Sequence, residues 1–146
     1  MVLDTKNIFI DVATNFFGFL VDTHGFDGPY VLQDKKTGFV IVIFRKKNLA
    51  VELIFDSREE DIDCKIARVE KGKIAEDYSV DSRGNVVRQS LSKLLREHGV
   101  RNSLFTKVTG LSIEDRIKIT AKDFLNMLTK YGTELLNDDP SFLGKQ

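Results

Sequence analysis

Acidic side chains are concentrated in one short stretch, and their carboxylates are the first groups in this chain that could do chemistry. The stretch contains Asp56, Arg58, Glu59, Glu60, Asp61 and Asp63, with a single base among five acids. Carboxylates can hold Mg²⁺ or Ca²⁺, act as acid and base in hydrolysis, or contact a basic partner. The spacing does not match an EF-hand loop and lacks the glycine of its sharp turn. We therefore expect a charged surface turn that binds a protein, and no metal site.

Other arrangements that could carry catalysis are missing from the sequence. The two histidines, His24 and His98, are far apart, and the chain contains neither a GxSxG elbow nor a GxxxxGK[ST] phosphate loop. Cys64 alternates with polar neighbours and is expected to point into the core. These observations favour a binding protein without catalytic residues or cofactors. A small carboxylate-dependent hydrolase stays as an alternative, and it would need a pocket around Asp56, Glu59 or His24.

Charge is segregated along the chain although the net charge is zero, with 22 basic and 22 acidic residues. The segment 52–63 is acidic, whereas the segment 83–107 carries one acid, Glu97, among six bases. These bases are Arg83, Arg88, Lys93, Arg96, Arg101 and Lys107. A zero net charge argues against a dedicated nucleic-acid binder. Nucleic-acid binding through a basic helix over residues 86–98 is retained as a second alternative.

The elements that must position these charges centre on two apolar runs. Residues 39–44 form an unbroken apolar segment, which is typical of a strand buried on both faces. A polar break at 45–48 separates it from residues 49–56, so we predict a hairpin. In the second strand Leu49, Val51, Leu53 and Phe55 share one face, and Ala50, Glu52, Ile54 and Asp56 share a second face that we expect to be partly wet.

The remaining patterns predict an α+β fold in one domain over residues 1–146. We expect a four-stranded antiparallel meander covered mainly on one face by three helices. The predicted elements are a helix over 4–23, an edge strand over 30–33, a strand over 62–67, a polar connection over 70–78, a helix over 86–98, a loop over 100–111 and a helix over 113–137. Ile8, Phe17 and Phe19 lie off or beside the apolar stripe of the first helix, so they are either buried or part of a homodimer interface.

The strand–turn–strand pattern around Asp56, Arg58 and Glu59 resembles small bacterial toxin-immunity proteins of the cytosol. The resemblance covers residues 8–68 and includes the helix, a Gly-Phe turn and the strands. It implies a protein that binds a toxin stoichiometrically through charged loops, and it carries over no catalytic residue.

The expected cellular location follows from the cysteine count and from the lack of a recognisable secretory signal or membrane-spanning segment. A single cysteine excludes an internal disulfide, which suits a reducing compartment. The first residues show no secretory signal, and no apolar run approaches the roughly 20 residues of a transmembrane helix. We therefore expect a cytoplasmic protein that does not contact the membrane.

Overall fold

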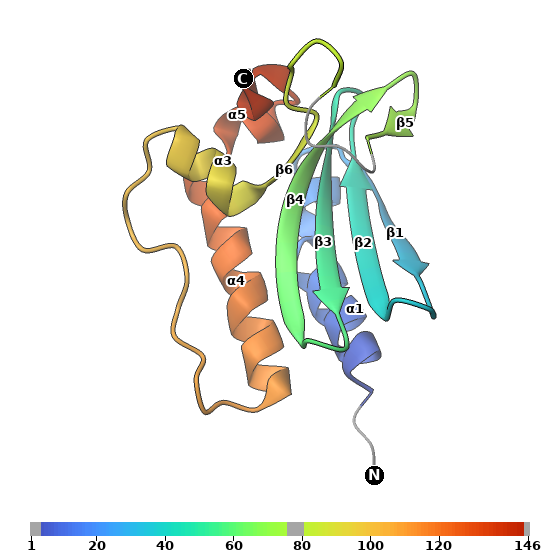
Figure 1. Ribbon diagram of the computed structural model, residues 1–146, viewed down its shortest axis with the longest axis vertical. Helices are drawn as coiled ribbons and strands as arrows, with labels where there is room; N and C mark the ends of the chain where they lie inside the picture. The colour runs from blue at the N-terminus through green and yellow to red at the C-terminus, as the bar shows by residue number, and fades with distance from the viewer. Residues whose placement is uncertain (1–3, 76–80, 145–146) are drawn as a thin grey trace.

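The computed structural model describes residues 4–75 and 81–144, which form an α+β fold (Figure 1). The elements are α1 (Thr5–Phe16), α2 (Gly18–Asp22), β1 (Asp27–Gln33), β2 (Phe39–Arg45), β3 (Leu49–Asp56), β4 (Asp61–Glu70), β5 (Lys73–Ile74), β6 (Arg88–Ser90), α3 (Leu91–Glu97), α4 (Ile113–Tyr131), α5 (Thr133–Leu136) and the 3-10 helix η1 (Pro140–Leu143). The predicted connection over 70–78 lies partly outside the described residues, and its first part contains β5.

The strands form one antiparallel sheet in the order β1-β2-β3-β4, and both β5 and β6 pair with β4. The predicted antiparallel meander is therefore confirmed, but four strands and three helices were too few. The hairpin of β2 and β3 is regular, with Val42 opposite Leu53 and Ile41 opposite Ile54. The sheet curls into a half-barrel, which gives its two faces different surroundings.

One face of the sheet packs against the helices. In Figure 1, α1 lies behind β2 and β3, and α4 runs beside β4. Phe9 of α1 stacks on Phe55 of β3 with ring centroids 5.3 Å apart. Cys64 is fully buried on this face, as its alternation predicted. Burying this apolar surface is the main force that holds helices and sheet together.

The first predicted helix is interrupted where glycine follows a run of aromatic residues. Asp4 caps α1 by accepting a hydrogen bond from the Asn7 amide at 3.2 Å. The helix α1 ends at Phe16, Phe17 follows as its C-cap, and α2 begins at Gly18, a residue that is unfavourable inside a helix. Phe17 is fully buried, and Ile8 and Phe19 pack against the same core. Phe17 is thus buried within the chain, whereas Ile8 and Phe19 are half-buried.

The predicted helix over 86–98 is wrong in its first half. Val86 and Val87 precede β6, which pairs with β4, and the helix α3 begins only at Leu91. Ser90 caps α3 by accepting from the Lys93 amide. Pairing with β4 satisfies the backbone groups of residues 88–90. Arg88 is therefore a strand residue.

The C-terminal helix and its preceding loop agree with the sequence. Residues 100–111 contain no helix or strand, and α4 begins after Ser112, whose hydroxyl accepts from the Asp115 amide at 3.1 Å. Gly132 separates α4 from α5. Among the described residues, no helix combines the length and the apolar character that crossing a bilayer requires.

The end of the described chain returns to the central hairpin. The Asp138 carboxylate accepts hydrogen bonds from the amides of Asn48, at 3.1 Å, and Leu49, at 2.9 Å. Lys46 donates from Nζ to the carbonyl oxygen of Leu136 at 3.1 Å. The turn between β2 and β3 is thus completed by residues about ninety positions later in the chain.

Candidate functional site

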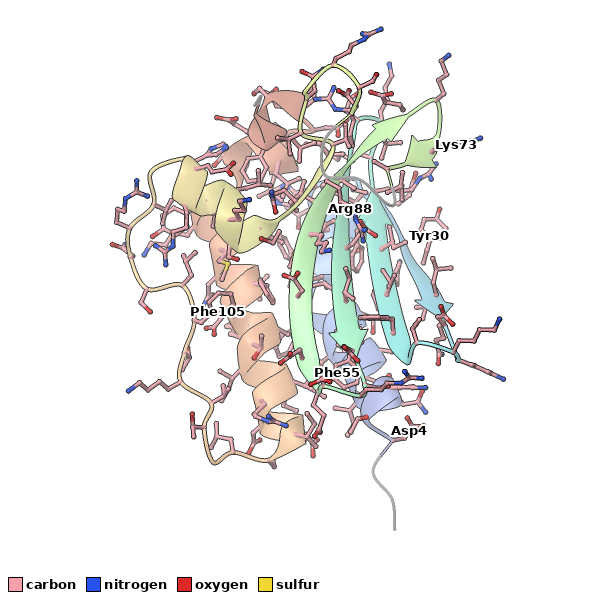
Figure 2. All side chains as sticks on the ribbon, viewed as in Figure 1. Asp4, Tyr30, Phe55, Lys73, Arg88 and Phe105 are labelled. Carbon is pink, nitrogen blue, oxygen red and sulfur yellow. The ribbon has the colours of Figure 1, made fainter. Side chains whose placement is uncertain are left out.

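The second face of the sheet, opposite the helices, is where charged and apolar side chains meet. We call it the open face. The register places Tyr30 and Leu32 of β1 on it, beside Ile43 and Ile41 of β2. Side chains of β3, β4 and β6 continue the surface in Figure 2, where Tyr30 and Arg88 are labelled. The further open-face residues are Phe39, Ala50, Glu52, Ile54, Asp56, Asp61, Asp63, Lys65, Ala67 and Ser90.

The middle of the open face is drier than the sequence suggested. Ala50 and Ala67 are fully buried there, and together with Ile43 and Val69 they form a small apolar cluster. Ile41 and Ile74 pack against this cluster. The expectation of a partly wet face is therefore wrong at its centre, because the sheet curls and β5 brings Ile74 onto it.

A buried ion pair crosses this apolar surface. Glu52 of β3 is 5% exposed, and its Oε1 accepts a hydrogen bond from Arg88 Nε at 2.9 Å. Arg88 Nη2 lies 3.4 Å from Oε2, so the contact engages both carboxylate oxygens. A charge taken out of water is tolerated when it is paired and hydrogen-bonded in this way. The pair therefore holds β6 against the rest of the sheet.

Below this pair, towards the β3–β4 turn, the open face is hollowed into a groove of about 770 Å³. Leu32, Phe39, Ile41, Ile54 and Ile62 line it with apolar surface. Its other lining residues include four aspartates, namely Asp34, Asp56, Asp61 and Asp63, and two bases, Lys65 and Arg88. An apolar groove with a few charged groups around it is the usual form of a binding site.

The predicted acidic stretch is divided by the structure. Asp56, Asp61 and Asp63 line the groove, whereas Arg58, Glu59 and Glu60 do not. Arg58 donates from Nη2 to the carbonyl oxygen of Lys36, in the turn between β1 and β2. Glu60 pairs with Arg116 of α4 at 3.6 Å, and Glu59 is exposed. The stretch therefore faces both the groove and the surface at the end of the sheet.

Several groove carboxylates also organise the local backbone. Asp56 Oδ1 accepts from the Arg58 amide at 3.0 Å and the Asp63 carboxylate accepts from the Cys64 amide at 2.8 Å. Asp34 accepts from the Lys36 amide at 2.9 Å, and this hydrogen bond lowers the pKa of the Asp34 carboxyl below its usual value. Asp34 is thus held in its charged form at the mouth of the groove.

The histidines lie elsewhere, in contacts that account for them structurally. The His24 ring makes an edge contact with Phe19 at 5.7 Å between centroids. His98 Nε2 lies 2.9 Å from the carbonyl oxygen of Phe142, which ties α3 to η1. Neither histidine is among the described residues that line the groove. Within residues 4–75 and 81–144, no group of three His, Cys, Asp or Glu side chains is placed to hold a metal ion.

Sequence reasoning missed the Glu52–Arg88 pair and the apolar wall of the groove. The pair could have been predicted from Glu52, a lone carboxylate inside an apolar strand, because such a charge needs a partner when the strand is central. The edge strand over 30–33 was predicted, but nothing in the sequence indicated that Leu32 and Phe39 would line one groove with the aspartates. The chain matches no protein-family profile, no curated protein and no solved structure.

Proposed function

We propose that the protein is a non-enzymatic protein-binding module that holds its partner stoichiometrically at the groove end of the sheet. The acidic stretch, residues 56–63, and the groove together form the contact surface. The supporting observation is that four aspartates and two exposed apolar side chains, Leu32 and Phe39, line the same groove. That chemistry suits a partner that presents basic side chains next to an apolar one.

The partner that best fits is a basic protein segment, as in a toxin neutralised by an immunity-type protein. Phe39 is 37% and Leu32 is 55% exposed beside the groove, so burying them would contribute a hydrophobic gain. The surrounding carboxylates would speed the encounter and reject acidic partners.

The two alternative functions are less well supported by the geometry. The hydrolase alternative needs a pocket that brings a carboxylate together with a second acid or base; Asp56 lines the groove, whereas Glu59 and His24 do not. The nucleic-acid alternative relied on a basic helix over residues 86–98, but Arg88 lies on strand β6 and its charge is paired with Glu52.

The test is the rate of association with the protein encoded by the neighbouring gene, measured by biolayer interferometry at low and high salt. The double variant Glu59→Lys/Glu60→Lys should associate about tenfold more slowly at low salt, and the difference should shrink as salt screens the charges. Glu70→Lys/Glu97→Lys reverses two exposed acids outside the stretch and serves as the control. Equal association rates for the two double variants would contradict the acidic stretch as the contact surface.

A further inference from the structure

Strand β1 is an edge whose usual protection, a proline and an irregular register, is confined to its first residues. Within residues 4–75 and 81–144 it pairs with β2 on one side and with no strand on the other. Tyr30, Val31 and Leu32 are 50%, 40% and 55% exposed. Edge strands are normally guarded by charges or by a covering element, because their open backbone groups recruit another strand. From Tyr30 to Gln33 there is no charged side chain.

The register shows which backbone groups face outward. Ile41 and Ile43 of β2 lie opposite Leu32 and Tyr30, whereas Val42 lies opposite both Val31 and Leu53. The Asp34 amide donates to the carbonyl oxygen of Phe39 at 2.9 Å. Hydrogen-bonded and non-bonded pairs alternate in an antiparallel ladder. Asp34, Leu32 and Tyr30 therefore direct their backbone groups towards β2. The N–H and C=O groups of the residues between them, Gln33 and Val31, point to the free edge.

We propose that two copies of this chain pair antiparallel through β1, with Leu32 on the two-fold axis. In this register Val31 of each copy exchanges hydrogen bonds with Gln33 of the other, and the two Leu32 side chains lie opposite each other. Shifting the axis to Val31 would place Pro29, in the irregular part of β1, opposite Gln33. Shifting it to Gln33 would place Val31 and Tyr30 opposite lysines.

The charges at the ends of the strand favour a second copy over an unrelated strand. Asp27 lies before the apolar segment, and Lys35 and Lys36 follow it, and all three are exposed. In the proposed register the basic turn that follows β1 in one copy lies at the end of β1 that carries Asp27 in the other, at both ends of the interface. Opposite charges on facing strands stabilise the pairing.

The pairing also extends the groove. A two-fold axis between antiparallel edge strands runs perpendicular to the sheet, so both open faces lie on the same side. Leu32 lines the groove of its own copy. The second Leu32 then adjoins it, which continues the apolar surface from one groove to the next. The dimer does not depend on the acidic stretch, so Glu59→Lys/Glu60→Lys should dimerise like the wild type.

The first test is sedimentation equilibrium of the full chain between about 1 and 300 µM, the range in which a small interface dissociates. The wild type should change from monomer to dimer. Val31→Pro should weaken dimerisation about thirtyfold, because each dimer loses two N–H donors. Proline is tolerated at an edge position whose N–H faces outward. Leu32→Lys should also give monomers through like-charge repulsion, and Leu32→Val should stay dimeric.

The second test fixes the register and needs no destabilising change. Leu32→Cys should form a disulfide-linked dimer under mild oxidation, because directly opposed residues lie within disulfide reach. Lys35→Cys is the matched control, since its two copies would be about 20 Å apart along the strands. Cys64 is fully buried and does not interfere. A wild type that stays monomeric at 300 µM, or equal cross-linking of both cysteine variants, would overturn the proposal.

Discussion

Arg88 reaches Glu52 across an intervening strand. Arg88 lies opposite Ala67 of β4, and Glu52 of β3 lies opposite Lys65 of β4, yet Nε and Oε1 are 2.9 Å apart. The guanidinium therefore passes over β4 and joins β6 to the centre of the sheet. The contact is buried beside an apolar cluster, so its loss leaves a charge in a poor environment.

The first prediction concerns this pair. Glu52→Ala should lower the free energy of unfolding by about 3 kcal/mol, because Arg88 is left without its main counter-charge in a largely dry site. The double variant Glu52→Leu/Arg88→Met should recover most of the loss, since no charge remains to be buried. Urea unfolding followed by circular dichroism measures both. A double variant as unstable as the single one would show that the charges are not the cause.

The second prediction concerns Asp138, which accepts from the amides of Asn48 and Leu49. Asp138→Ala should cost about 2 kcal/mol of unfolding free energy, because two amides at the β2–β3 turn lose their acceptor. Asp138→Asn should cost less, because it keeps a carbonyl acceptor and tolerates the positive φ of 59°. Asp139→Ala removes one exposed capping hydrogen bond of η1 and is the comparison, with an expected smaller loss of about 1 kcal/mol. Equal stability of Asp138→Ala and wild type would show that these hydrogen bonds contribute nothing to the free energy of unfolding.

The third prediction concerns the loop between α3 and α4. Asp123 is 8% exposed and accepts from both the amide and the hydroxyl of Thr106 at 2.8 Å. Asp123→Ala should release the loop and expose its backbone, at a cost of about 2 kcal/mol. Hydrogen exchange should show faster labelling of residues 103–107 and unchanged labelling of β2 and β3. Uniformly faster exchange would mean a global effect instead.

The fourth prediction concerns pH. Burial, and then the nearby Asp63 and Glu52, raise the pKa of the Cys64 thiol well above its ordinary value of 9.0. The unfolded chain loses this proton near pH 9 and the folded chain keeps it, so stability falls as pH rises above about 9. The slope of unfolding free energy against pH should be steeper in the wild type than in Cys64→Ala, by up to about 1.4 kcal/mol per pH unit. Parallel slopes would contradict a buried, protonated thiol.

The central hairpin and most helices could be predicted because their signals are local. The apolar run 39–44 and the alternation of 49–56 each determine a strand without help from the rest of the chain. Capping by Asp4 and Ser112 fixes the starts of α1 and α4. Such features need only a few neighbouring residues, which is why the α+β fold and the antiparallel sheet were predicted correctly.

The features that the sequence did not predict depend on contacts between distant residues. β6 exists because residues 88–90 find β4 as a partner, and their own pattern was compatible with a helix. The dry centre of the open face depends on sheet curl and on Arg88, which comes 36 residues after Glu52. The role of the acidic stretch stays a prediction, although the structure places three of its aspartates beside the groove.

The tie between Asp138 and the β2–β3 turn has a consequence for synthesis on the ribosome. The hairpin leaves the exit tunnel while the residue that completes its turn, 90 positions later, has still to be translated. Until then the Asn48 and Leu49 amides depend on water. The β2–β3 turn therefore gains this acceptor only after Asp138 has emerged from the tunnel as well.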